Sequence, residues 1–426
     1  MQHVSIKKAV EKGQGQVHIR GWVYRERGNK NIKFLVIRDS TGIIQCVAQN
    51  NLQNFEEIQT LQIETSVKIS GTIKKDERAP TGYEINIENI EVIGKSDKFP
   101  IQKDQSKELL ADNRHLWLRS RKMTAIMKVR NTVFKAIRDY FHEEGFYEFH
   151  SPIFQATQTE GGSEVFEVKY FDTKMYLAQT WQLPAEAGIF GLEKIYTIAP
   201  SFRAEKSKTS RHLTEYWHAE VEEAWANFDD IINHGENMLK KIVNAVLEEN
   251  KEDLETLERD VNKLKSAIAK DFEKMTYTKA LEILKEKENM EVEWGKDLRT
   301  VEEDKLSALY QTPIIITHYP KKVKAFYMKE APGETVLGCD FIAPEGYGEI
   351  IGGSEREESI EKIVARLKEQ GEDPNEYEFY LDTRRYGSVP HSGFGMGVER
   401  IIAWICGLET IKDAIAFPRT MTRYTP

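Results

Sequence analysis

Short segments in which apolar and polar residues alternate fill the first hundred positions, and they constrain the fold more than any other feature of the chain. The segments are 16–24, 32–38, 42–47, 66–73 and 83–92, and Gly, Asn, Asp or Ser-Thr turns separate them. A period of two is typical of strands that bury one face. Five such strands in so short a length predict a small closed barrel.

The number of strands indicates which kind of barrel this is. The OB-fold is a five-stranded barrel, and one of its faces binds oligonucleotides. We therefore expect an all-β OB-fold over residues 1–95. The mixed-charge stretch 96–112, which contains Pro100, is expected to be a hinge.

Beyond the hinge, the hydrophobic period becomes helical. Apolar residues recur at helical spacing over 122–144, and Gly145 follows them. A strand that ends at Pro152 comes next. We assign 113–426 to a second domain, in which the charged, helix-rich stretch 229–287 is expected to be a solvated helical insertion.

Length and composition narrow the class of protein. A chain of 426 residues is long enough for two or three domains. No apolar run approaches the roughly 20 residues that span a bilayer, and the first residues lack the apolar core of a signal peptide. Cys46, Cys339 and Cys406 are scattered without CxxC spacing, which suits a reducing compartment. We expect a cytoplasmic protein without a membrane partner.

The stretch 200–217 contains the side chains that a nucleotide site needs. Arg203 and Arg211 supply fork-shaped donors that match phosphate oxygens. Glu205 can accept a hydrogen bond from an adenine amino group, and Tyr216 or its neighbour Trp217 can stack on the ring. This stretch therefore predicts a nucleotide-binding segment.

A second group of polar residues surrounds a glycine-rich turn. Asp340 and Glu349 flank the turn, so both carboxylates could converge on one hard cation with oxygen ligands. Magnesium that bridges phosphates is the expected ion, because it neutralises charge on a triphosphate. The pair Gly352-Gly353 lets backbone approach a ligand closely, and Arg356 then projects a bidentate donor.

A third group lies upstream of the other two. The Gly-Gly loop of 159–166, beside Glu160, can fold over a small molecule and present a carboxylate to an amine. Gln182 and Glu186 add an amide and a second acid. This group predicts a site for a small molecule with an amino group.

The order of these segments resembles a known enzyme family. The stretch 200–217 followed by 393–400 resembles motif 2 followed by motif 3 of the class II aminoacyl-tRNA synthetases. The helix and strand of 122–153 resemble motif 1, the dimer-interface element, and 114–119 matches the segment that opens the catalytic half. The resemblance is to the aspartyl, asparaginyl and lysyl subgroup, whose members also carry an N-terminal OB-fold for the anticodon, and it covers 15–426.

Membership of this family implies an α+β fold, in which helices flank an antiparallel-sheet catalytic core behind the OB-fold barrel. It also implies ATP as a substrate, Mg²⁺ as a cofactor, a tRNA as a partner, and a homodimer. In the implied metal site, Asp340 and Glu349 hold the magnesium ion.

The resemblance further implies roles for single residues at the ATP site. Arg203 would contact the α-phosphate, and His212 and Arg400 would reach the outer phosphates. Arg203 and Arg400 are the residues implied to be catalytic. Adenine would lie against Glu205 and Tyr216. The complete implied set is Arg203, Glu205, Arg211, His212, Tyr216, Glu349 and Arg400.

At the implied amino-acid site, Glu160 and Glu220 would face the ammonium group of the substrate. Gln182 would lie beside the substrate backbone, and Arg356 would bind the side-chain carbonyl. The complete implied set is Glu160, Ser163, Gln182, Glu186, Glu220 and Arg356.

In the barrel, the resemblance implies an anticodon site. Phe34 matches the position that stacks on a base, and Gln45 matches a position that recognises a base. Arg25 or Arg27 would contact a phosphate or a base edge. Stacking combined with hydrogen bonds to splayed-out bases is how such barrels recognise single-stranded RNA.

Two positions favour asparagine as the amino acid. Aspartyl enzymes place a lysine three residues beyond the glutamine that matches Gln182, and here that position is Ala185. Glu186 could accept a hydrogen bond from a side-chain amide and repel a carboxylate. Together with the stretches 217–220 and 343–354, these positions resemble asparaginyl enzymes of the compact archaeal type, which act on asparagine and tRNA(Asn).

Three alternatives stay open at this point. An aspartyl enzyme, whether it charges tRNA(Asp) alone or both tRNA(Asp) and tRNA(Asn), is disfavoured by Ala185. An ammonia-dependent asparagine synthetase on the same core would lack the barrel of 15–92. A non-catalytic RNA-binding relative is disfavoured because the residues implied to be catalytic, Arg203 and Arg400, are present. Trp181 and Pro184 depart from the usual pattern of the family and affect the wall of the amino-acid pocket.

Overall fold

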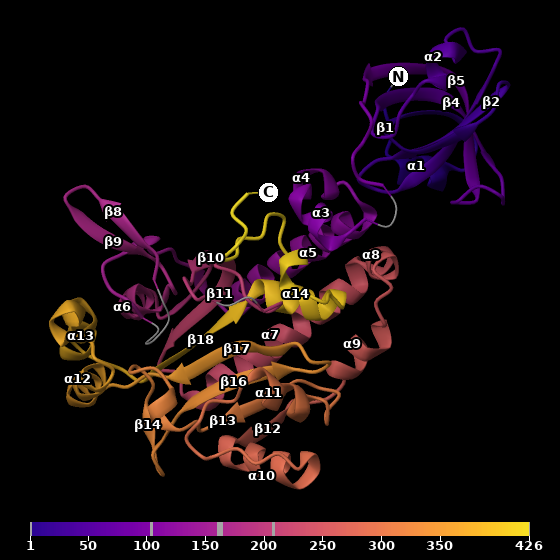
Figure 1. Ribbon diagram of the computed structural model, residues 1–426. Coiled ribbons are helices and arrows are strands. Elements are labelled where there is room, and N and C mark those ends of the chain that lie inside the picture. The colour runs from indigo at the N-terminus through magenta and orange to yellow at the C-terminus, as the bar shows by residue number, and fades with distance from the viewer. Residues whose placement is uncertain (1, 103–104, 160–164, 207–208, 426) are drawn as a thin grey trace. The chain divides into compact units, whose positions relative to one another are not determined.

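The structure is a computed structural model that describes residues 2–102, 105–159, 165–206 and 209–425. It divides into two compact units, Met1–Asn113 and Arg114–Pro426 (Figure 1). No helix in the described part of the chain is long and apolar enough to cross a membrane.

The first unit is a closed five-stranded barrel, as the alternating pattern predicts. Its strands follow the order β1-β2-β3-β5-β4, and all neighbours are antiparallel except β3 and β5. Alternate residues such as Ile19, Leu35 and Ile69 fill the interior. A Cβ at Gly71 would collide with the backbone carbonyl of Asn86, so glycine permits the close approach of β4 and β5.

The elements of this unit have the following bounds: α1 (Ile6–Lys12), β1 (Gly15–Gly28), β2 (Ile32–Arg38), β3 (Ile43–Gln49), α2 (Phe55–Gln59), β4 (Ser66–Lys75), β5 (Tyr83–Gly94) and α3 (Lys107–Asp112). The helix α3 lies within the stretch that we expected to be a hinge.

The second unit is built on an eight-stranded, mainly antiparallel sheet, which agrees with the α+β class expected from the sequence. The strand order is β12-β13-β16-β17-β18-β11-β10-β6, and only the pairs β12–β13 and β10–β6 are parallel. The strands are β6 (Tyr147–Glu148), β10 (Lys194–Phe202), β11 (Glu215–Ala224), β12 (Glu273–Thr276), β13 (Ile314–Thr317), β16 (Gly338–Ala343), β17 (Gly348–Glu355) and β18 (His391–Gly397).

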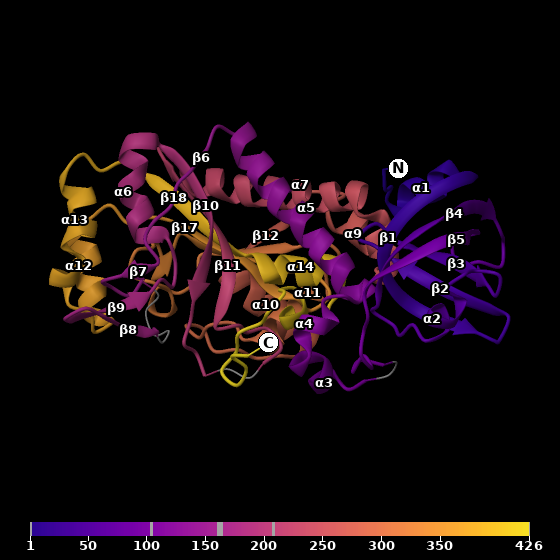
Figure 2. The ribbon, with the colours of Figure 1, turned by 90° about the horizontal axis from the view of Figure 1, so that it is seen from above.

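Three helices form one apolar core with this sheet. They are α5 (Arg121–Glu143), α7 (Phe228–Glu249) and α14 (Val398–Cys406). Figures 1 and 2 show α5 and α7 side by side along the sheet. Ser120 caps the first turn of α5 by accepting a hydrogen bond from the Met123 amide.

The stretch 229–287 differs from the solvated insertion that we expected. Its first helix, α7, buries Ile231, Met238 and Ile242 in the main core, and its strand β12 belongs to the central sheet. The high charge of the stretch concealed an apolar stripe with a helical period, which fixes α7 against the sheet. The stretch is therefore part of the architecture of the second unit.

The remaining helices of this unit are α4 (Arg114–Trp117), α6 (Gln182–Leu192), α8 (Lys251–Thr256), α9 (Val261–Ala267), α10 (Tyr277–Glu288), α11 (Thr300–Ser307), α12 (Ile360–Glu369) and α13 (Glu378–Arg385). A three-stranded sheet contains β7 (Phe154–Gln155), β9 (Thr173–Leu177) and β8 (Glu167–Tyr170), and β14 (Glu330–Ala331) pairs with β15 (Thr335–Val336).

Candidate active site

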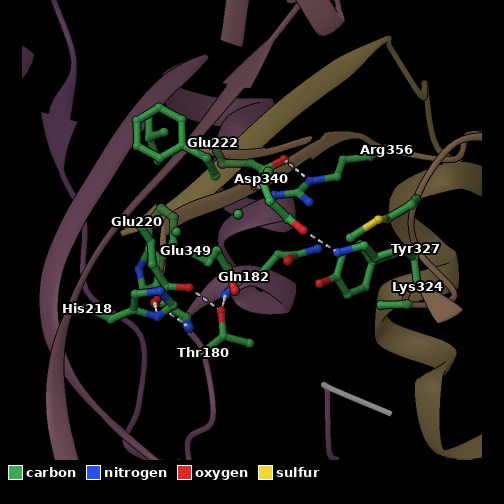
Figure 3. Close-up of a pocket in the computed structure, with 18 of the residues that line it drawn as sticks. Thr180, Gln182, His218, Glu220, Glu222, Lys324, Tyr327, Asp340, Glu349 and Arg356 are labelled. Atoms are coloured by element: carbon green, nitrogen blue, oxygen red, sulfur yellow. Dashed lines mark hydrogen bonds and ion pairs between the residues drawn. The ribbon is translucent and has the colours of Figure 1, made fainter. Parts of the chain in front are cut away.

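A group of polar side chains lies over the middle of the eight-stranded sheet, in a pocket of about 460 Å³ (Figure 3). Residues 218, 220 and 222 of β11 share one face, because successive side chains of a strand alternate. They lie opposite the glycines of β18, and a Cβ at Gly395 would come within 2.5 Å of the His218 ring. The repeated glycines of β18 therefore make room for the polar side chains of β11.

Glu222 and Arg356 form a buried ion pair in this pocket. The Arg356 Nε and Nη2 atoms donate to the two Glu222 oxygens at 2.9 and 2.8 Å. Arg356 is 3% exposed and Glu222 is 1% exposed. Burial raises the pKa of the Glu222 carboxyl, and the Arg356 guanidinium limits the rise. The pair offers one acceptor group and one donor group at a fixed distance.

Glu220 is held beside this pair by the chain that enters α6. Its carboxylate accepts hydrogen bonds from the Thr180 hydroxyl and, at 2.9 Å, from the Trp181 amide. Burial alone would raise the pKa of Glu220, but His218, Thr180 and the Trp181 amide hold it below its ordinary value. Glu220 is therefore a carboxylate in the pocket and can face an ammonium group.

The structure corrects our expectation for Glu186, which does not line the pocket. The side chain is fully buried, and its oxygens accept from Arg384 at 2.6 Å, from His391 at 3.1 Å and from Gln182 at 2.8 Å. Arg384 lies 198 positions away in sequence, so no local pattern reveals this pairing. Because the Gln182 amide nitrogen donates to Glu186, its carbonyl oxygen is the group left for a ligand.

Sequence reasoning missed Glu222, although a signal was present. The residues 218, 220 and 222 lie on one face of a strand, and glycines occupy 393, 395 and 397 of the facing strand. An acid that must fit over a glycine in the centre of a sheet is a strong candidate for a site residue.

The Glu186–Arg384 pair carries a prediction about stability. Arg384→Met leaves a buried carboxylate without its main counter-ion, and we expect the free energy of unfolding to fall by about 3–5 kcal/mol. Arg385→Met is the matched control, because Arg385 is partly exposed and forms surface pairs with Glu378 and Asp382. Its effect should stay below about 1 kcal/mol. Denaturant unfolding measures both values, and equal losses would contradict this account of the pair.

Asp340 and Glu349 converge as expected from the sequence. A Cβ at Gly352 would lie 2.9 Å from Glu349 Oε1 and 3.6 Å from Asp340 Oδ1, so both carboxylates border the same open space. Burial raises the pKa of Asp340 to about 6, although the Lys324 ammonium at 2.7 Å opposes the rise. Two carboxylates that face one space beside a glycine fit a hard cation such as Mg²⁺.

A smaller hollow of about 110 Å³ borders the first pocket and contains the residues of the expected nucleotide segment. The two cavities share Arg203, His218, Glu349 and Gly395. The lining of the smaller hollow includes Arg203, Glu205, Arg211, His212, Tyr216, Glu349 and Arg400. The structure thus brings together the complete set that the sequence implied for ATP.

Local contacts orient several members of this set. The Arg203 guanidinium lies 5.7 Å from the centre of the Tyr216 ring, and His212 Nε2 lies 3.6 Å from Glu205 Oε2. Burial and the charge of Arg400 lower the pKa of His212. The ring of Trp217 instead packs edge-on against the ring of Phe134 beside the main core, and the two ring centres lie 5.6 Å apart. Tyr216 is therefore the aromatic residue of the pair that borders the nucleotide pocket.

In the barrel, three of the four expected anticodon residues lie together. The Arg27 guanidinium lies 5.1 Å from the centre of the Phe34 ring, and Arg27 Nη2 donates to Gln45 Oε1 at 3.4 Å. Arg25 lies over the ring of Tyr24. Glu160 and Ser163, which we expected at the amino-acid site, fall outside the described residues.

Comparisons with known proteins agree with both units. Residues 106–421 match the family model described as tRNA synthetases class II (D, K and N), and residues 17–93 match the OB-fold nucleic acid binding domain. The antiparallel sheet, its motifs and the barrel thus define the class: a class II tRNA synthetase with an OB-fold domain.

The curated relatives narrow the class further. The chain is 48% identical over 415 residues to an asparagine–tRNA ligase of Thermococcus gammatolerans and 44% identical over 431 residues to one of Streptococcus pneumoniae, and each match covers 96% of both chains. A structure of asparaginyl-tRNA synthetase from Pyrococcus horikoshii complexed with asparaginyl-adenylate superposes with a TM-score of 0.96, at 45% identity and full coverage of both chains. The chain belongs to the asparaginyl-tRNA synthetases.

Proposed function

We propose that this enzyme activates L-asparagine with ATP to form asparaginyl-adenylate and then transfers the asparaginyl group to tRNA(Asn). The observation that carries the choice of amino acid is the buried Glu222–Arg356 pair. A neutral amide has one donor group and one acceptor group. It can donate to the Glu222 carboxylate and accept from the Arg356 guanidinium.

The same pair disfavours aspartate. A substrate carboxylate would lie beside Glu222, and Arg356 is already neutralised by that residue. Position 185 holds a buried alanine, which supplies no cation to compensate for a second negative charge. Placing a like charge in a buried site is costly, and the site therefore selects the amide.

The first chemical step needs no nucleophile from the enzyme. The asparagine α-carboxylate attacks the α-phosphorus of ATP, the new C–O–P linkage forms, and pyrophosphate leaves. Arg203 borders both cavities and can bind charge at the junction of the two substrates, and Arg400 lies in the nucleotide hollow. Catalysis of this kind depends on positioning and on charge neutralisation.

The magnesium ion, when bound, would neutralise phosphate charge, and Asp340 and Glu349 would hold it. Glu220 would bind the ammonium of asparagine, and the Gln182 carbonyl oxygen would accept from the substrate backbone. In the second step, a ribose hydroxyl of the terminal adenosine of the tRNA attacks the adenylate carbonyl, and AMP leaves.

The barrel supports tRNA selection, which leads to a prediction about Phe34. We expect Phe34→Ala to lower kcat/KM for tRNA about 10- to 100-fold, because stacking on a base is worth roughly 1–3 kcal/mol. The rate of ATP–pyrophosphate exchange should not change, since that reaction uses only the second unit. Trp22→Ala is the control. Trp22 is an exposed aromatic residue of the same barrel, and it lines a hollow that includes none of the expected anticodon residues. Equal charging by wild type and Phe34→Ala would contradict the assignment.

The enzyme is also proposed to be a cytoplasmic homodimer. Large apolar side chains are exposed within the segment that resembles motif 1, with Tyr147 at 59% and Ile153 at 42%, and directly after it, with Phe154 at 44%. Cys46, Cys339 and Cys406 are free and buried, which suits a reducing compartment. Light scattering coupled to gel filtration tests the assembly, and a monomer at micromolar concentration would contradict it.

A further inference from the structure

The orientation of Arg211 is determined by elements that lie far from it in the sequence. Its Nη2 atom donates to the Asp304 carboxylate at 2.7 Å, and it also donates to the backbone carbonyl of Gly346. Asp304 belongs to α11, and Gly346 lies in the turn between β16 and β17. Asp304 and the Gly346 carbonyl therefore hold one edge of the guanidinium group together.

The other edge of the same group faces no acceptor within hydrogen-bond distance in the described part of the chain. Arg211 Nη1 is buried and has no hydrogen-bond partner among the described residues. It lies 3.0 Å from the place that a Cβ of Gly348 would occupy, and Glu303 Oε2 lies 2.8 Å from the same place, so glycine at this position leaves room for both groups. Leaving a buried N–H without an acceptor costs free energy, which an acceptor on a ligand would recover.

The place of Arg211 in the fold indicates which ligand that is. Arg211 lines the nucleotide hollow together with Arg203, His212 and Arg400. Three arginines and a histidine around one hollow fit a polyphosphate. Because the guanidinium is planar, a fixed Nη2 edge also fixes the direction of the Nη1 donors.

We propose that Asp304 is a positioning residue for the ATP site, which holds Arg211 so that its Nη1 edge faces the phosphate oxygens of ATP. The inference rests on the proposed function, because it takes the hollow to be the ATP site. Asp304 does not line either cavity and acts only through Arg211. The Asp304 side chain is 39% exposed, and the Arg211 side chain, which loses its counter-ion in Asp304→Ala, is 21% exposed.

The test compares kinetic constants for both substrates in ATP–pyrophosphate exchange. We expect Asp304→Ala to raise KM for ATP about tenfold, because the freed Arg211 side chain must be ordered when ATP binds. The KM for asparagine should stay within about twofold of wild type. Asp304→Asn keeps an acceptor for Nη2 and should fall between wild type and Asp304→Ala. Lys305→Met, on the same helix, is the control and should behave as wild type.

A double-mutant cycle separates positioning from a general structural effect. Once Arg211→Ala has removed the guanidinium, adding Asp304→Ala should not raise KM for ATP further. Multiplicative effects of the two changes would overturn the proposal, as would an equal rise of both KM values in Asp304→Ala. If the wild-type protein shows no asparagine-dependent exchange at all, the proposed function fails. If wild type exchanges normally but the two changes multiply each other's effect on KM for ATP, only the proposed role of Asp304 fails.

Discussion

Replacing Arg203 by alanine should reduce asparagine-dependent ATP–pyrophosphate exchange about 10³-fold. Arg203 borders both cavities, and the proposed function therefore places it where the α-carboxylate of asparagine would meet the α-phosphate of ATP. A preorganised donor at the point where charge develops in the transition state is typically worth 10²- to 10³-fold, and cationic arginines in phosphoryl transfer reach about 10³ or more. The loss should appear mainly in kcat.

Two further variants make this result specific. Arg203→Lys keeps the positive charge but loses the planar pair of donors with which arginine binds phosphate, so we expect an intermediate rate. Arg385→Ala removes an exposed arginine on α13 and should leave the rate unchanged. Thermal unfolding of all three variants shows whether the fold persists. Exchange by a folded Arg203→Ala protein within tenfold of wild type would contradict the position of Arg203 at the reaction centre.

Replacing Glu222 by glutamine should weaken the selection of asparagine over aspartate about 10³-fold. The change removes the negative charge that neutralises Arg356, and the freed guanidinium can then bind a substrate carboxylate. Asparagine also loses a charged acceptor for its amide nitrogen. Sites built to hydrogen-bond a particular substrate group discriminate by several orders of magnitude, so one such residue can decide the amino acid.

The measured quantity is the ratio of kcat/KM for asparagine and aspartate. Glu215→Gln, an exposed acid at the start of the same strand, is the matched control and should keep the wild-type ratio. A Glu222→Gln enzyme that remains folded and keeps the wild-type ratio would assign amide recognition to another residue.

The barrel was predictable because its signal is local. Alternation along each strand fixes which face is buried, and Leu35 and Ile69 lie in the interior as that pattern requires. Much of the nucleotide set lies close together in sequence, because Arg203 and Glu205 follow β10 directly and Tyr216 lies at the start of the antiparallel strand β11. Residues so close in sequence must also lie close together in space, whatever the rest of the fold.

Contacts between distant segments were not predictable in the same way. Glu186 was expected at the amino-acid site because its carboxylate could accept a hydrogen bond from a side-chain amide. The side chain of Glu186 turns instead toward Arg384 and His391, which come from α13 and β18. The apolar face of α7 was likewise obscured by its charges. Which face of a helix is buried depends on the partner that packs against it, and a single sequence does not specify that partner.

The most direct test measures ATP–pyrophosphate exchange with asparagine, with aspartate, and with aspartate plus ammonia, followed by charging of unfractionated tRNA. The proposed function predicts strong exchange with asparagine, at least about 10²-fold weaker exchange with aspartate, and asparagine esterified to tRNA. Comparable exchange with aspartate, or formation of free asparagine from aspartate and ammonia, would contradict it.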